Sequence, residues 1–333
     1  MTRNISFISM FRRERRSMKR KMRDSILIYG SGTMGCGIAC CAALAKNDVL
    51  LYDIQPVSLE MARNRIEANL SELAANGLCS EEQKSDAITR IQPVQDLDSA
   101  FPRVKLVIEA VFENLELKQD VFQMLDAKLP VEVPILSNTS GLRISDIAAK
   151  TSHPERTLTT HFWLPAHLIP LVEVVVGDHS SPDLAAEIKT MLSSWGKSPV
   201  LVNKDLPGQL ANRILQAVIR EASNIVDMGL ASAEDVDTSI KMGMALRFPV
   251  WGPLEHVDAV GMELCRSVQN TVLPVISASQ KASPIFDRFV SEGRLGSKSG
   301  AGFYDWSKKS MPELEQRRNE FIIYALKKIR EHK

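Results

Sequence analysis

The sequence predicts an α/β fold, with a doubly wound, mainly parallel sheet in the first two thirds of the chain and an all-helical domain in the remainder. Short apolar runs alternate with helical segments up to about residue 205, which is typical of a parallel sheet covered by helices. Strand signals stop after Leu206-Pro207-Gly208. At 333 residues the chain has room for two domains, expected over 25–205 and 206–333.

The expected strands are short apolar runs, most of them bounded by turn or helix signals. They are short enough to cross a sheet and rich in Val, Ile and Leu. The runs are Ser25–Tyr29, Val49–Tyr52, Leu106–Ala110, Ile135–Asn138, Leu158–Phe162, Leu171–Val176 and Val200–Val202.

Helix boundaries are indicated by capping residues and glycine stops. Thr33–Lys46 is a helix rich in small side chains, and the long helix that follows the second strand ends at Asn76-Gly77, a left-handed stop. Ser80 with Gln83 forms a capping box that opens another helix. The helices expected in the second domain are Leu210–Met228, Ala233–Met242, Pro253–Val260 and Pro312–Glu331.

Composition excludes several classes of protein. Hydrophobic residues make up 44% of the chain and the formal net charge is +1, which argues against a general nucleic-acid or membrane-surface binder. The five cysteines have neither metal-binding nor disulfide-framework spacing, and no apolar run reaches the roughly 18 residues of a membrane helix. We therefore expect a cytoplasmic protein without a metal site.

Residues 1–24 differ from the rest, because basic side chains crowd positions 12–23 with few core-forming residues among them. We expect a disordered basic tail. A transit peptide is an alternative, against which Glu14 and the missing amphipathic stripe argue, and translation from Met18 or Met22 is another. Nucleic-acid binding through this tail is a further hypothesis about function. It rests on a segment outside the expected folded domains.

The segment from Gly30 to Gly35 reads Gly-Ser-Gly-Thr-Met-Gly and predicts a Rossmann dinucleotide site. It follows a strand, opens a helix, and precedes by about 20 positions an acidic residue, Asp53, at the end of the next strand. A carboxylate at that position accepts ribose hydroxyls and repels a 2′-phosphate, so NAD is favoured over NADP. The expected cofactor-binding residues here are Gly30, Gly32, Thr33, Met34, Gly35 and Asp53.

A second candidate site combines the segments 137–140, 161–165 and 171–175. His161 leaves a strand toward a proline-containing loop, and Glu173 is the only charge inside an apolar strand. A buried carboxylate needs a partner, and a nearby imidazole would supply one. From these residues alone, a catalytic pair and a structural pair are both open.

These motifs resemble the 3-hydroxyacyl-CoA dehydrogenase family from about Ile26 to Trp306. The resemblance is carried by the glycine turn, Val107-Ile108-Glu109-Ala110 through Lys118, Ser137-Asn138-Thr139-Ser140, the His and Glu segments, Pro207-Gly208 with Asn212-Arg213, and Lys298-Ser299-Gly300 through Tyr304. It implies a helical dimerisation domain, hence a homodimer, and a catalytic His161–Glu173 pair assisted by Ser140 and Asn212. It also implies cofactor contacts by Ala110, Glu113, Lys118, Asn138, Ser140 and Lys298.

The sequence differs from the family pattern at two places that bear on the substrate. Leu164 stands where the family has an asparagine, and the helix after Asp53 carries no lysine cluster for the phosphates of CoA. The leading expectation is hydride transfer between NAD and the 3-hydroxyl or 3-keto carbon of a 3-hydroxyacyl-CoA, in fatty acid metabolism. The alternatives are a CoA-free substrate such as carnitine, a sugar acid or a pyridine carboxylate, and a non-enzymatic, crystallin-like NAD-binding protein.

Overall fold

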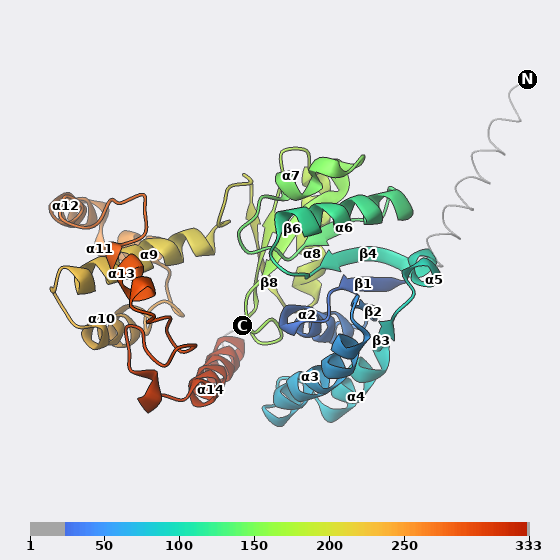
Figure 1. Ribbon diagram of the computed structural model, residues 1–333, viewed down its shortest axis with the longest axis horizontal. Coiled ribbons are helices and arrows are strands. Elements are labelled where there is room, and N and C mark those ends of the chain that lie inside the picture. Colours follow the sequence, from blue (N-terminus) through green and yellow to red (C-terminus); the bar gives the residue numbers. More distant parts are fainter. Residues whose placement is uncertain (1–23, 332–333) are drawn as a thin grey trace, which may run out of the picture. The chain divides into compact units, whose positions relative to one another are not determined.

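The computed structural model describes residues 24–331, and the chain divides after Leu210 into two compact units (Figure 1). The first unit carries the sheet and the second is helical. The tail expected over residues 1–24 lies outside the described residues, apart from Asp24.

One eight-stranded sheet forms the first unit, in the order β3-β2-β1-β4-β5-β6-β7-β8. All neighbouring strands are parallel except β6 and β7, which are antiparallel. The predicted doubly wound, mainly parallel sheet is therefore confirmed. The strands are β1 Ser25–Tyr29, β2 Asp48–Tyr52, β3 Ile91–Val94, β4 Val104–Glu109, β5 Ile135–Ser137, β6 Thr157–Phe162, β7 Leu171–Val175 and β8 Ser198–Val202.

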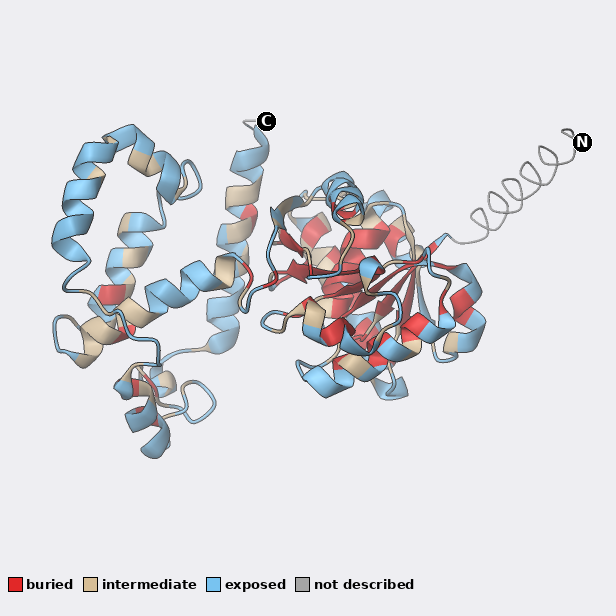
Figure 2. Cartoon of the chain, turned by 90° about the horizontal axis from the view of Figure 1, so that it is seen from above, coloured by how far each residue is buried: buried red, intermediate tan, exposed pale blue. Residues whose placement is uncertain are grey.

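Helices cover both faces of this sheet, so its central strands are buried throughout and read as continuous apolar runs. Ile26, Leu27 and Ile28 of β1, for example, are all inaccessible to solvent. Figure 2 shows the buried residues gathered in and around the sheet. The α-helices of the unit are α2 Thr33–Leu44, α3 Pro56–Ala75, α4 Glu81–Arg90, α5 Leu97–Ala100, α6 Leu115–Lys128, α7 Ile144–Ile147 and α8 Pro182–Ser194.

Local signals set most boundaries in this unit. The capping box of Ser80 and Gln83 opens α4, and Gly77 adopts a left-handed φ of 68° after α3, both as predicted. The edge strand β3 was not expected, because Ile91-Gln92-Pro93-Val94 has no alternation and contains a proline. Proline is tolerated there because an edge strand can leave an N–H outside the ladder.

The second unit is helical, as predicted. Its α-helices are α9 Ala211–Asp227, α10 Ala233–Ser239, α11 Pro253–Val260, α12 Met262–Val272, α13 Pro284–Ser291 and α14 Met311–Glu331. A π-helical turn over Ile240–Met244 extends α10. Helices α12 and α13 were not expected from the sequence. In the described part of this unit four hydrophobic side chains are buried, those of Val236, Ile285, Phe289 and Ile323. Most of its apolar side chains are therefore exposed in a single chain.

Candidate active site

The glycine turn between β1 and α2 has the shape of a dinucleotide cradle. Gly30 has a φ of 115°, and a Cβ atom there would lie 2.6 Å from the carbonyl oxygen of Ala110. A Cβ on Gly35 would lie 1.9 Å from the carbonyl oxygen of Gly30, whereas Gly32 faces open space. No side chain of the described residues caps the N-terminus of α2. Its N–H groups are therefore suited to a pyrophosphate, and the turn fits NAD.

Asp53, at the end of β2, holds this turn in place. Its Oδ2 accepts hydrogen bonds from the backbone N–H of Ser31 at 2.9 Å and from Ser31 Oγ at 2.8 Å. Its Oδ1 accepts from the backbone N–H of Gln55 at 3.0 Å. The carboxylate thus lies beside the turn, as a ribose-binding residue requires. The Arg65 guanidinium lies nearby, 3.5 Å from the carbonyl oxygen of Ser31. This contact was not predicted, because Arg65 follows Asp53 by twelve positions and reaches the turn only through the path of α3.

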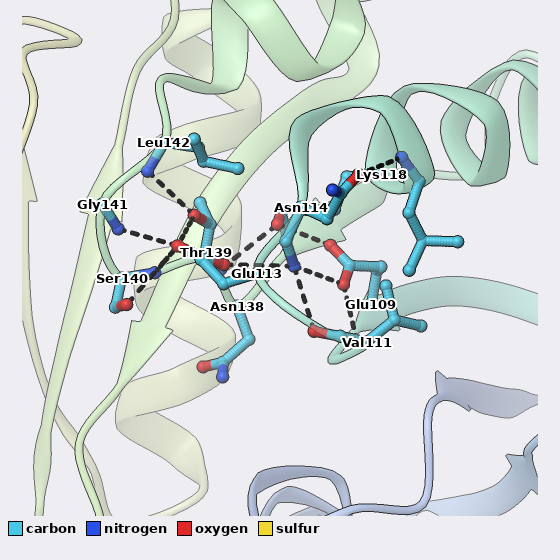
Figure 3. Close-up of polar contacts among 12 residues, drawn as sticks. Glu109, Val111, Glu113, Asn114, Lys118, Asn138, Thr139, Ser140, Gly141 and Leu142 are labelled. Atoms are coloured by element: carbon cyan, nitrogen blue, oxygen red, sulfur yellow. Dashed lines mark hydrogen bonds and ion pairs between the residues drawn. The ribbon is translucent and has the colours of Figure 1, made fainter.

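Glu113 joins the loop after β4 to the loop after β5 (Figure 3). Its Oε1 accepts from Thr139 Oγ1 at 2.6 Å and from the backbone N–H groups of Ser140 and Gly141, each at 3.0 Å. Burial alone would raise the pKa of Glu113, but the Thr139 hydrogen bond, the Lys118 charge and the two N–H donors together lower it. Ser140, expected to contact substrate and cofactor, is therefore positioned by Glu113.

A buried ion pair lies beneath this contact. Lys118 Nζ is 2.7 Å from Glu109 Oε1, and the other oxygen of Glu109 accepts from Ser137 Oγ at 2.6 Å. Lys118 also lies 3.5 Å from Glu113 Oε2. Lys118 was expected on the cofactor side, and here its amine contacts both glutamates (Figure 3). Glu109 was not singled out from the sequence, although a charge that ends an apolar strand is the signal that would have found it.

His161 and Glu173 lie directly opposite each other on the antiparallel strands β6 and β7. Opposed residues in such a pair project from the same face. Their side chains are buried, and His161 Nδ1 is 2.7 Å from Glu173 Oε2. Glu173 Oε1 accepts from the backbone N–H of Leu210 at 2.8 Å. The structure therefore brings together the two residues that were predicted to form a pair.

Two side chains hold the end of β6 next to this pair. Asn138 Oδ1 accepts from the backbone N–H of Phe162 at 2.8 Å, so Asn138, expected on the cofactor side, fixes the strand that carries His161. Trp163 Nε1 donates to Glu173 Oε2 at 3.0 Å, and this contact was not predicted. Leu164, the departure from the family pattern, is 53% exposed and follows directly.

The remaining predicted site residues belong to the second unit. Asn212 lies in the first turn of α9. Lys298 lies in the segment between α13 and Trp306, where it lines a cavity of about 690 Å³ together with Phe289, Tyr304 and Trp306.

Comparison with known proteins decides the family. Residues 25–206 match the 3-hydroxyacyl-CoA dehydrogenase NAD binding domain, and residues 208–306 match the C-terminal domain of the same family. The chain belongs to the 3-hydroxyacyl-CoA dehydrogenase family. It is therefore an NAD-dependent dehydrogenase with a Rossmann domain and a helical C-terminal domain, as the sequence predicted.

Two relatives illustrate the range of the family. A probable 3-hydroxybutyryl-CoA dehydrogenase of Bacillus subtilis is 36% identical over 286 residues, covering 86% of this chain and 98% of the relative. The 5-formyl-3-hydroxy-2-methylpyridine 4-carboxylate 5-dehydrogenase of Mesorhizobium japonicum is 32% identical over 310 residues, covering 93% of this chain and 99% of the relative.

Solved structures show the same two kinds of relative. The crystal structure of 5-formyl-3-hydroxy-2-methylpyridine 4-carboxylic acid 5-dehydrogenase, an NAD+-dependent dismutase, has a TM-score of 0.85 at 31% identity and covers 92% of this chain and 98% of its own. That of (S)-3-hydroxybutyryl-CoA dehydrogenase from Ralstonia eutropha has a TM-score of 0.72 at 32% identity and covers 86% of this chain and 100% of its own.

Within residues 24–331, the structure holds no helix with both the length and the apolar character needed to cross a bilayer.

Proposed function

We propose that His161 is the general acid/base of hydride transfer between a substrate CH–OH group and NAD, and that Glu173 orients it. The observation that carries the proposal is the 2.7 Å contact between His161 Nδ1 and the buried Glu173 carboxylate. Because Nδ1 faces the carboxylate, Nε2 is the nitrogen that can serve the substrate. A non-enzymatic, crystallin-like protein would have no need to keep this pair.

Alcohol oxidation needs such a base. An alcohol carbon is a poor hydride donor until its oxygen begins to carry negative charge, so a base must take the hydroxyl proton. Imidazole titrates near neutral pH and suits this task. Glu173 favours the imidazolium that forms, while Ser140 and Asn212 are proposed to hydrogen-bond the substrate oxygen or the imidazole. NAD, when bound, accepts the hydride.

The leading proposed substrate is a 3-hydroxyacyl-CoA of the 3-hydroxybutyryl type, oxidised at its 3-hydroxyl in fatty acid metabolism. Family membership supports it, as do two relatives that carry this activity in their names at 36% and 34% identity.

A second candidate is a CoA-free hydroxy acid or alcohol, a pyridine carboxylate among them. Leu164 replaces an expected amide with an apolar side chain, and α3 carries Arg63 and Arg65 without a lysine cluster. The pyridine carboxylate dehydrogenase also matches 93% of this chain, a span that exceeds the region matched by the two family domains.

A screen of NAD reduction and NADH oxidation tests both candidates. It compares 3-hydroxybutyryl-CoA and acetoacetyl-CoA with carnitine, sugar acids and hydroxylated or formylated pyridine carboxylates. Turnover of the thioesters supports the leading substrate, and turnover of CoA-free compounds alone rejects it. The same screen on His161→Gln shows whether the observed turnover depends on the proposed base.

We also propose that the enzyme is a cytoplasmic homodimer joined through its second unit. Helix α12 carries Leu264 and Val268, each more than half exposed and one turn apart. Figure 2 shows that exposed residues dominate the helices of this unit. Association with a second copy would remove such exposed apolar side chains from water.

A further inference from the structure

Trp163 lies one residue beyond β6, half-buried, and contacts the His161–Glu173 pair directly. Its Nε1–H donates to Glu173 Oε2 at 3.0 Å, the same oxygen that lies 2.7 Å from His161 Nδ1. The indole and imidazole centroids are 5.6 Å apart. We propose that Trp163 is a positioning residue that sets the proton affinity and the orientation of the pair. This inference rests on the proposed function, in which His161 carries the proton.

The hydrogen bond from Trp163 lowers the basicity of Glu173. A carboxylate that accepts an added hydrogen bond is stabilised in its charged form and becomes a weaker base. The indole can only donate, so its contact with Oε2 always acts in this direction. Leu210 donates to the other oxygen of Glu173 at 2.8 Å. Because both donors stabilise the charged carboxylate, Glu173 stabilises the imidazolium of His161 less than it would without the indole.

The same hydrogen bond fixes the direction of Glu173 Oε2. His161 and Trp163 share this oxygen, so rotation of the carboxylate would break both contacts. The imidazole plane is thereby fixed through Nδ1, which leaves Nε2 pointed away from the carboxylate. Orienting partners of this kind preserve the reactive geometry of the group they hold.

Other charged groups lie on or against the segment that follows the indole. Lys197 Nζ donates to two backbone carbonyls of that segment, at 2.6 and 3.0 Å, and His167 Nε2 pairs with Glu72 at 2.9 Å. On the neighbouring strand β8, the residue in register with Glu173 is the uncharged Val200. The Trp163 variants keep Lys197, His167 and Glu72. A comparison of these variants with the wild-type enzyme therefore isolates the effect of the indole on the His161–Glu173 pair.

Trp163→Phe removes the donor and keeps an aromatic ring. Without the donor Glu173 is a stronger base and the imidazolium of His161 is more stable. The acidic limb of kcat/KM for oxidation should therefore move to higher pH by about half to one unit. Loss of the orienting contact should lower kcat about tenfold. Trp195→Phe changes a half-buried tryptophan at the end of α8 and should alter neither quantity.

A second variant and a direct measurement keep the test independent of folding and of turnover. Benzothienylalanine at position 163 replaces the N–H with sulfur and preserves the shape of the indole. NMR titration of the His161 imidazole in the full-length enzyme should give a higher midpoint in both variants than in the wild type. Absence of turnover with every substrate would reject the proposed function, whereas the NMR comparison would still test Trp163. Unchanged midpoints in both variants would overturn the inference.

Discussion

Lys118 and Glu109 form a fully buried ion pair, with 2.7 Å between Nζ and Oε1 and side chains that are 1% and 0% exposed. The pair ties the start of α6 to the end of β4. Glu109 also accepts from Ser137, at the end of β5, and from the backbone N–H of Val111 at 2.7 Å. Two loops of the candidate site are thus anchored to one carboxylate.

Lys118→Met should strongly destabilise the first unit. The substitution leaves the Glu109 charge buried without its cation, a change that typically costs about 3–5 kcal/mol. Urea unfolding of the cofactor-free enzyme followed by circular dichroism measures the loss. Lys128→Met is the control, because Lys128 forms an exposed pair with Asp98 and should cost less than about 1 kcal/mol. Equal effects of the two substitutions would contradict the role assigned to the buried pair.

The carboxyl of Glu113 should make the enzyme sensitive to acid. Its pKa is lowered in the folded state, so the stability it contributes is present above its unfolded value, about 4.3, and is lost as pH falls through the folded value. Between about pH 5 and 3, wild type should lose more stability than Glu113→Gln, which cannot be protonated there. Glu116→Gln, on the exposed first turn of α6, should behave as wild type in the same thermal-melting series.

Boundaries set by local chemistry were predicted well. The predicted ends of β1 and α11 agree with the structure. A glycine turn follows β1, and α11 begins at Pro253 and stops before Gly261, so both elements have clear boundary residues in the sequence. Strand β3 was missed because pairing with β2, and not its own composition, makes Ile91–Val94 extended. Asp53, His161 and Glu173 were predicted as site residues from their positions at or within strands, and their roles stay predictions. Trp163 and Arg65 were not predicted, because their contacts depend on side-chain directions that spacing does not reveal.

Asp53→Ala should weaken discrimination between NAD and NADP. The carboxylate lies beside the glycine turn through Ser31, where it would accept ribose hydroxyls and repel a 2′-phosphate. Its removal should cost about tenfold or more in NAD affinity and improve NADP binding, aided by the nearby Arg65 guanidinium. Fluorescence titration with NADH and NADPH measures both changes. Asp48→Ala, at the other end of β2, should preserve the preference, and an unchanged preference in Asp53→Ala would reject the assignment.

Substitution of the exposed apolar side chains on α12 should disrupt a dimer. Leu264 and Val268 are 58% and 52% exposed, and glutamates at both positions would place two charges in the proposed interface. Sedimentation velocity at micromolar concentration should show a dimer for wild type and a monomer for the double variant. Val131→Glu, a comparable exposed valine of the first unit, should remain dimeric. A wild-type monomer under these conditions would remove the dimer proposal.

His161→Gln should collapse turnover while NAD binding stays nearly unchanged. The amide can keep a hydrogen bond to Glu173 but cannot carry the hydroxyl proton, and removal of a positioned acid/base typically costs about 10²–10⁴ in rate. Glu173→Gln should slow turnover less and change its pH profile, because the amide cannot stabilise the imidazolium across the 2.7 Å contact. NADH titration separates this effect from lost cofactor binding, since the glycine turn and Asp53 do not involve His161. Near-wild-type turnover of His161→Gln on a substrate that the screen identifies would require another base for this reaction.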